Sequence, residues 1–169
     1  RARAFGAEVI VCQKRSEANK LAEEKEQEGY FFIHPSANDD VIAGQGTAAL
    51  EALEEIGDVD AIFAPCGGGG LIAGCYLASL MLPRKPQIFA CEPLNANDAA
   101  RSVQEGKIFS FADSPNSIAD GARTLAVKEP CFTYLKKLDG ILEITEEEIA
   151  LWQKNLSEIL QMKIEPTSA

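Results

Sequence analysis

Short apolar runs alternate with longer amphipathic segments along most of the chain. Runs rich in β-branched and aromatic residues predict strands at residues 7–12, 30–34, 60–64, 87–91 and 140–144. Segments with apolar residues at helical spacing predict helices at residues 16–29, 40–56, 71–82, 97–105, 130–138 and 145–160. Strands and helices that alternate without hairpin signals predict an α/β fold, an open and mostly parallel sheet with helices on both faces.

The same pattern is interrupted at both ends of the chain. Residues 1–6 resemble the end of a helix, and residues 165–169 stop where a further helix is expected. We therefore expect residues 1–169 to form a single, incomplete domain of a longer polypeptide.

Four consecutive glycines lie between the predicted strand 60–64 and the predicted helix 71–82. Glycine loses more conformational entropy on folding than any other residue, so four in a row are costly in a plain connection. Without Cβ atoms, successive N–H groups can face one point beside the positive end of the helix. The sequence therefore predicts a site for a phosphate or another compact anion.

Three interpretations of this loop can be compared from the residues alone. A P-loop is excluded because no lysine follows Gly70 or Gly74. The dinucleotide pattern G-x-G-x-x-[GA] is met by Gly68, Gly70 and Ala73, with Glu92 as the acid for a ribose, but any glycine run meets it easily. A turn without a ligand is the third interpretation.

The composition and net charge of the chain limit the kinds of partner that it can bind. Of the 169 residues, 46% are hydrophobic and 25% are charged, as in a globular domain, and the net charge is −10. This charge argues against nucleic acid and anionic membrane surfaces as partners, so a phosphate would need a local site. No apolar run is long enough to span a membrane.

The side chains that could bind a metal or act as nucleophiles are few. His34 is the single histidine, and we interpret it as structural. Five cysteines show no zinc spacing, which favours free thiols and a reducing, cytoplasmic compartment: Cys12, Cys66, Cys75, Cys91 and Cys131.

Several motifs, in their order and spacing, resemble those of the serine/threonine dehydratases. The motifs are R-A-F-G-A-E-V-I, I-H-P, D-D-V-I-A-G-Q-G-T, P-C-G-G-G-G-L-I-A-G, A-C-E-P, I-A-D-G and I-E-P-T-S-A. This family belongs to the tryptophan-synthase-β-like (fold type II) pyridoxal-phosphate enzymes, which include serine racemases. The resemblance covers most of the large domain and implies that the small N-terminal domain and the C-terminal end lie outside this sequence.

The resemblance also implies which residues bind the cofactor. Gly121 would lie beside the cofactor ring, although a plain turn explains this glycine equally well. Glu165 would lie on the pyridine side, although alone it resembles an exposed acid at a helix start. Backbone amides would bind the phosphate at Gly67, Gly68, Gly69, Gly70 and Leu71.

In several members of the family a divalent cation binds near the motif A-x-E-P. Here the matching positions are Glu92, the carbonyl of Ala96, and Asp98. Oxygen ligands at this spacing suit Mg²⁺ or Ca²⁺. Without a metal, Glu92 would end a strand and Asp98 would begin a helix.

The implied reaction is β-elimination from L-serine or L-threonine to a 2-oxo acid and ammonia. The lysine that holds the cofactor lies in an S-x-K-x-R-G segment of the family, and these 169 residues contain no such segment. We therefore expect no catalytic residue in this chain and no activity from it alone. Its partners would be an amino-acid substrate, the remainder of its own chain and further copies in a homo-oligomer.

Two alternative functions remain open from the sequence alone. A serine racemase or a hydroxyaspartate ammonia-lyase would differ in residues of the small domain. A non-catalytic nucleotide- or phosphate-binding module, in which Glu92 contacts a ribose, is the alternative from another class.

Overall fold

The computed structural model describes residues 1–169, apart from the side chain of Arg15. The chain forms two compact units, Arg1–Ile33 and His34–Ala169. That all 169 residues belong to one domain of the whole protein stays a prediction.

The first unit contains one 3₁₀ turn and one helix. The turn η1 (Ala2–Phe5) ends at Gly6, whose left-handed φ of 83° explains the glycine, and the helix is α1 (Arg15–Gln27). The segments at residues 7–12 and 30–33 are extended, but neither pairs with any part of the described chain as a strand. The prediction of strands there was wrong for this structure, because a strand needs a neighbour to complete its hydrogen bonds.

The second unit is built on a parallel three-stranded sheet. Its strands are β1 (Ala61–Pro65), β2 (Gln87–Pro93) and β3 (Gly140–Ile144), in the spatial order β1-β2-β3. The pairs Ala64–Ala90 and Ala90–Ile141 fix the register across the sheet. The carboxyl ends of all three strands therefore meet at one edge, where ligands bind in open α/β sheets.

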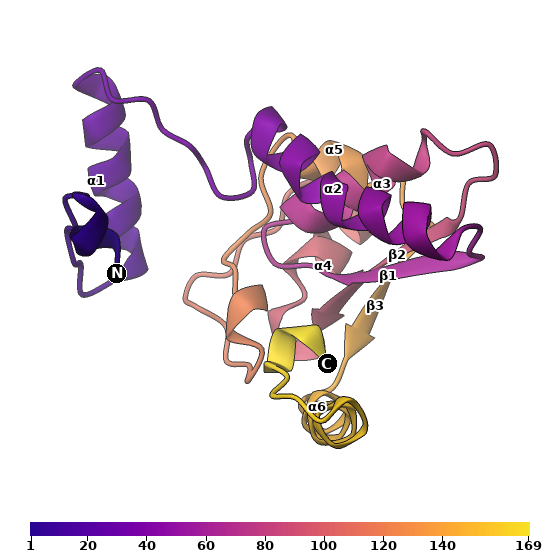
Figure 1. Cartoon of the computed structure of the whole chain (residues 1–169). Coiled ribbons are helices and arrows are strands. Elements are labelled where there is room, and N and C mark those ends of the chain that lie inside the picture. Colours follow the sequence, from indigo (N-terminus) through magenta and orange to yellow (C-terminus); the bar gives the residue numbers. More distant parts are fainter. The chain divides into compact units, whose positions relative to one another are not determined.

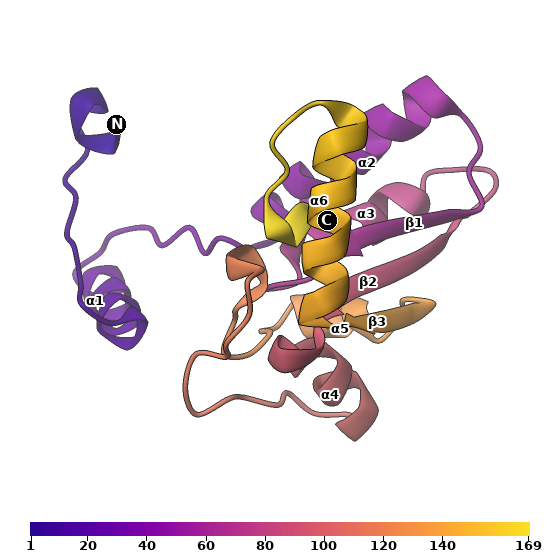
Figure 2. The ribbon, with the colours of Figure 1, turned by 90° about the horizontal axis from the view of Figure 1, so that it is seen from below.

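Helices lie on both sides of this sheet (Figures 1 and 2). Helices α2 (Asp39–Ile56) and α3 (Gly70–Ser79) cover one face, and α6 (Glu146–Leu160) lies on the other side. The remaining helices and 3₁₀ turns are short: η2 (Leu94–Ala96), α4 (Asp98–Glu105), η3 (Asp120–Ala122), α5 (Cys131–Leu135) and η4 (Pro166–Ser168). The predicted three-layer α/β architecture is confirmed.

The core lies between the sheet and helices α2 and α3. Ala64, Ile72 and Ile88 are almost fully buried there, at 8%, 0% and 2% exposure. Helices α2 and α3 pack closely because Gly46 and Gly74 face each other: a Cβ on Gly46 would lie 2.6 Å from the Gly74 carbonyl oxygen. The core thereby fixes α3, and with it the glycines that precede this helix.

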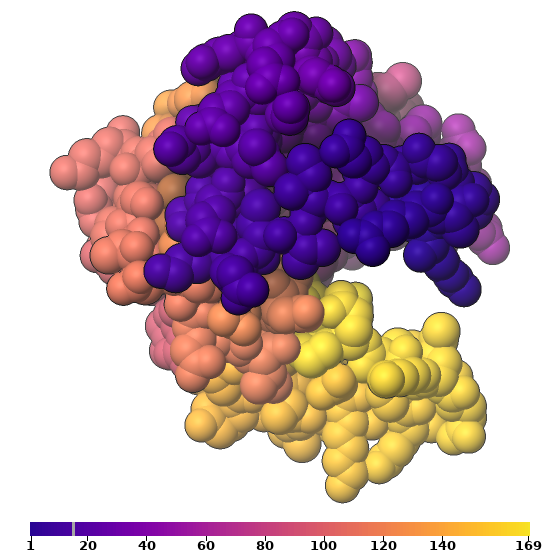
Figure 3. Space-filling model, turned by 90° about the vertical axis from the view of Figure 1, so that its left-hand side faces the viewer, coloured from indigo at the N-terminus to yellow at the C-terminus, as the bar shows by residue number. Residues whose placement is uncertain are grey.

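Helix α6 and the C-terminal turn η4 pack together at the surface of the second unit (Figure 3, yellow). Thr145 caps α6: its hydroxyl accepts from Glu148 N–H at 3.3 Å, and the Glu148 carboxylate accepts from Thr145 N–H at 3.0 Å. Gln153 Nε2 donates to the Ile164 carbonyl at 3.0 Å. These bonds fasten the segment that carries Glu165 to α6.

Within the described chain, no helix is both long enough and apolar enough to cross a bilayer.

Candidate functional site

The loop of residues 66–70, here called the glycine loop, joins the carboxyl end of β1 to the start of α3. Cys66 N–H donates to the Cys91 carbonyl at 2.7 Å, which ties the loop to β2, and Gly69 has a left-handed φ of 85°. From Gly67 to Leu71, no backbone N–H donates to an acceptor in the described part of the chain. Unpaired amides at the positive end of a helix are the arrangement that anion sites use, and binding of an anion here stays a prediction.

The glycine loop is closely surrounded by backbone. A Cβ on Gly67 would lie 2.6 Å from the Gly121 carbonyl oxygen, and a Cβ on Gly70 would lie 3.1 Å from Ser36 Cα. A Cβ on Gly68 would overlap the Ser36 hydroxyl. Packing against backbone therefore requires glycine at position 67, whereas a Cβ at position 68 or 70 would require Ser36 to shift.

Ser36 is a neighbour of the loop that sequence reasoning missed. The ring Nδ1 of His34 accepts from Ser36 N–H at 3.1 Å and from Ala37 N–H at 2.8 Å, and Cys131 Sγ donates to the Ser36 carbonyl at 3.1 Å. His34 thus holds the turn that places Ser36 over the glycines, which agrees with a structural histidine. The H-P-S sequence indicates a turn, but nothing local shows where that turn packs.

Gly121 lies against the glycine loop, and its position beside a cofactor ring stays a prediction. Its N–H donates to Thr167 Oγ1 at 3.1 Å, and the Glu146 carboxylate accepts from Ile118 N–H at 2.8 Å. The segment 118–121 is therefore held at both ends. Thr167 was also missed by sequence reasoning.

Glu165 is exposed and caps the last turn of the chain. Its carboxylate accepts from Thr167 N–H at 3.4 Å and from Ser168 Oγ at 3.0 Å. These bonds fix the side chain at the start of η4, and a role beside a cofactor ring stays a prediction.

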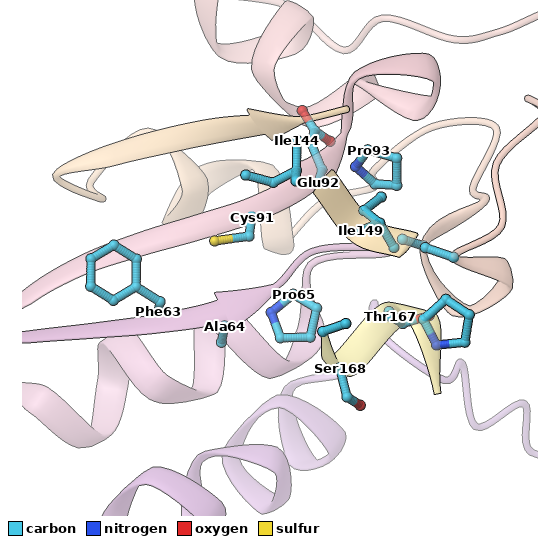
Figure 4. Close-up of a pocket in the computed structure, with 14 residues that line it drawn as sticks. Phe63, Ala64, Pro65, Cys91, Glu92, Pro93, Ile144, Ile149, Thr167 and Ser168 are labelled. Atoms are coloured by element: carbon cyan, nitrogen blue, oxygen red, sulfur yellow. The ribbon is translucent and has the colours of Figure 1, made fainter. Parts of the chain in front are cut away.

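A cavity of about 230 Å³ lies between the sheet and the segment formed by α6 and η4 (Figure 4). Phe63 and Cys91 line it from the strands, and Ile149, Thr167 and Ser168 line it from the other side. Side chains alternate along a strand, so Phe63 and Cys91 lie on the face opposite to Ala64 and Ala90, which pack in the core beside α3. None of the loop glycines lines this cavity.

The carboxylates proposed for a metal are deeply buried. Glu92 and Asp98 are 2% and 1% exposed, and Ala96, which lies between them in the sequence, is fully buried. Burial raises the pKa of Glu92 to about 8, although Ala99 and Ala100 N–H groups donate to its carboxylate, and burial raises the pKa of Asp98 to about 6. Asp98 Oδ1 accepts from Thr124 Oγ1 at 3.0 Å, whereas Oδ2 is buried without a hydrogen-bond partner.

The described side chains offer no group of three or more His, Cys, Asp and Glu arranged around one metal position. A cation at Glu92 and Asp98 would therefore depend on the Ala96 carbonyl and on water for its other ligands.

The five cysteines are free thiols. Cys66 and Cys131 lie beside the site but are buried, and burial raises the pKa of Cys131 to about 11 and that of Cys66 well above its ordinary value. Neither is suited to act as a nucleophile at neutral pH.

The comparison with known families matches the whole chain. The family model described as "Pyridoxal-phosphate dependent enzyme" covers residues 1–169. The chain belongs to this family.

The relatives of this chain within the pyridoxal-phosphate family are named for different reactions. The serine racemase of Dictyostelium discoideum is 40% identical over 98% of the chain, and the L-threo-3-hydroxyaspartate ammonia-lyase of Saccharomyces cerevisiae is 37% identical over 97%. The solved structure of a threonine deaminase from T.th. superimposes with a TM-score of 0.89 at 38% identity, covering 98% of this chain and 56% of that one.

The chain spans 52% and 51% of the lengths of the racemase and the ammonia-lyase. The comparisons thus establish the family and the fold, and they leave the reaction to be assigned.

Proposed function

We propose that this chain supplies the phosphate-binding half of a pyridoxal-phosphate site whose enzyme dehydrates and deaminates L-serine or L-threonine. The observation that carries the proposal is the set of unpaired amides from Gly67 to Leu71, with Gly121 packed against the same loop. In a member of a pyridoxal-phosphate family, free amides at a helix start are the groups needed to bind the phosphate of the cofactor.

The residues of the chain would bind and orient the cofactor. The amides of the glycine loop would bind the doubly charged phosphate through hydrogen bonds to a charged acceptor, which are stronger than neutral ones. The absence of a side chain at Gly121 would let the ring lie against the backbone, and Glu165 would lie on the pyridine side. When bound, pyridoxal phosphate supplies an electron sink for the α-carbanion of the amino acid.

The other requirements of the reaction would be met by the rest of the protein. Proton removal at the α-carbon needs a basic lysine, and the ten lysines of this chain lie outside any S-x-K-x-R-G segment. We infer that the catalytic lysine belongs to a part of the polypeptide beyond these residues, and that this chain alone is inactive.

The reaction can be assigned by measuring products from the protein loaded with cofactor. We expect L-serine to give pyruvate and ammonia, and L-threonine to give 2-oxobutyrate and ammonia, detected by reduction of the oxo acid with NADH and lactate dehydrogenase. Bound cofactor should absorb near the visible edge. A protein that binds NAD and shows no such absorbance would contradict the proposal.

A second candidate is supported by the relatives themselves. The serine racemase of Dictyostelium discoideum matches this chain at 40% identity, and the hydroxyaspartate ammonia-lyase matches it at 37%. Chiral chromatography of the serine remaining after incubation separates these outcomes: accumulation of D-serine without pyruvate would indicate racemization. Ammonia from L-threo-3-hydroxyaspartate alone would indicate the other lyase.

We also propose that Mg²⁺ or Ca²⁺ binds at Glu92, the Ala96 carbonyl and Asp98. The unpartnered Asp98 Oδ2 and the two buried carboxylates fit this ion, because a divalent cation would offset the cost of holding both charges away from water. Addition of Ca²⁺ should raise the unfolding temperature, and EDTA should reverse the increase. Equal unfolding temperatures with Ca²⁺ and with EDTA would contradict this site.

Five free thiols, three of them buried, support a cytoplasmic location for the enzyme. Assembly into a homo-oligomer is a further proposal, which sedimentation of the whole protein can test.

A further inference from the structure

Gly121 is held between two residues that are far away in the sequence. On one side, a Cβ added to Gly67 would lie 2.6 Å from the Gly121 carbonyl oxygen. On the other side, a Cβ on Gly121 would lie 2.9 Å from Thr167 Oγ1 and 3.4 Å from Thr167 Cβ. Gly67, Gly121 and Thr167 are thus stacked in that order.

The contact between Gly121 and Thr167 includes a hydrogen bond. Gly121 N–H donates to Thr167 Oγ1 at 3.1 Å, so the hydroxyl oxygen fixes the amide side of Gly121. The carbonyl of the same residue faces Gly67. The second anchor of the segment is Glu146, which accepts from Ile118 N–H at 2.8 Å. Rotation of the Asp120–Gly121 peptide would require the Thr167 bond to break, and the next peptide, which carries the Gly121 carbonyl, is held by Ala122 N–H donating to the Ala119 carbonyl at 3.0 Å.

We propose that Thr167 is a positioning residue for the phosphate loop, acting through the Gly121 backbone. The Thr167 hydroxyl holds Gly121, and the Gly121 carbonyl limits the movement of Gly67, whose amide belongs to the anion site. This inference rests on the proposed binding of pyridoxal phosphate at the glycine loop.

A positioning role differs from a purely structural one in what it predicts for stability. Gly121 is exposed, so water can replace the lost acceptor when the hydroxyl is removed. We therefore expect a small change in the unfolding temperature of the protein without cofactor, together with a clear loss of affinity for the cofactor.

The test compares Thr167→Val, which removes the hydroxyl at nearly constant volume, with Thr167→Ser, which keeps it. Thr133→Val is the matched control, because Thr133 is exposed on α5 and its hydroxyl bonds only to Glu129, at 2.8 Å. Each variant, freed of cofactor, is titrated with pyridoxal phosphate. We expect Thr167→Val to raise Kd about three- to tenfold, and Thr167→Ser and Thr133→Val to remain near wild type.

Amide hydrogen exchange provides a readout that does not depend on activity. In the wild-type protein, Gly121 N–H should exchange at least several times more slowly than in Thr167→Val, and it should be protected even if the valine variant fails to fold. A freely exchanging Gly121 amide in wild type would overturn the inference.

The outcomes separate this inference from the proposed function. If wild type does not bind pyridoxal phosphate, the proposed function fails. If wild type binds it and Thr167→Val binds it equally well, only the positioning role of Thr167 fails. If Thr167→Ser loses as much affinity as Thr167→Val, the hydroxyl is not the responsible group and the inference is again overturned.

Discussion

Replacing Gly67 with alanine perturbs the anion site at one defined contact. The added Cβ would lie 2.6 Å from the Gly121 carbonyl oxygen and 3.3 Å from Ala122 Cα, and both are backbone atoms that cannot rotate away. Ordinary contact begins near 3.4 Å, so the two segments must separate by about 0.8 Å, the difference between 3.4 and 2.6.

A displacement of this size is large compared with hydrogen-bond geometry. An amide about 2.9 Å from a phosphate oxygen would move to about 3.7 Å, beyond the range of a hydrogen bond. Loss of one bond to a charged acceptor costs about 1.5–3 kcal/mol, which corresponds to an increase of about ten- to hundredfold in the Kd for pyridoxal phosphate. Overpacking should also lower the free energy of unfolding by about 1–3 kcal/mol.

Fluorescence titration of the cofactor-free protein and urea unfolding measure the two effects. Gly44→Ala is the matched control: it lies inside α2, has no atom within 4 Å of its added Cβ, and should raise the free energy of unfolding by about 0.5–1 kcal/mol without changing Kd. A Gly67→Ala protein with the affinity and stability of wild type would refute the reasoning.

Two further predictions concern the core and the buried acids. Gly74→Ala should lower the free energy of unfolding in urea by at least about 2 kcal/mol, because its Cβ would lie 2.5 Å from Gly46 N and from the Ile42 carbonyl oxygen. An unchanged urea midpoint would count against the packing of α2 on α3. Without divalent cations, the free energy of unfolding should fall as pH rises from about 4 to about 8. Burial raises the folded-state pKa of Asp98 to about 6 and that of Glu92 to about 8. The folded protein therefore binds more protons than the unfolded chain across that range, and it loses this advantage as the pH rises. Urea unfolding at several pH values measures this slope, which should be shallower in Glu92→Gln; an identical slope in that variant would exclude Glu92 as its source.

The sequence was most informative where one residue type has one physical use. The loop between β1 and α3 was predictable because four glycines separate an apolar run from a helical segment, and the binding of an anion by its amides stays a prediction. Thr145 and Glu148 were recognisable as a capping box because that motif depends on local spacing alone. The parallel direction of β1 and β2 follows from alternating strands and helices, for which parallel neighbours are the rule.

Long-range contacts were not predictable in the same way. Ser36 and Thr167 contact Gly68 and Gly121 across long stretches of sequence, and neither belongs to a local pattern that names its partner. The segments at residues 7–12 and 30–33 have the composition of strands, yet they are unpaired in the described chain, because a strand is defined by its neighbour as well as by its own residues.

The backbone resonances of the glycine loop test the central claim most directly. Titration of the cofactor-free protein with pyridoxal phosphate, and separately with pyridoxal, distinguishes contacts to the phosphate from contacts to the ring. We predict large amide shifts at Gly67, Gly68, Gly69, Gly70 and Leu71 with pyridoxal phosphate and small shifts with pyridoxal. Saturable binding of pyridoxal phosphate that leaves these five amides unchanged would contradict the account.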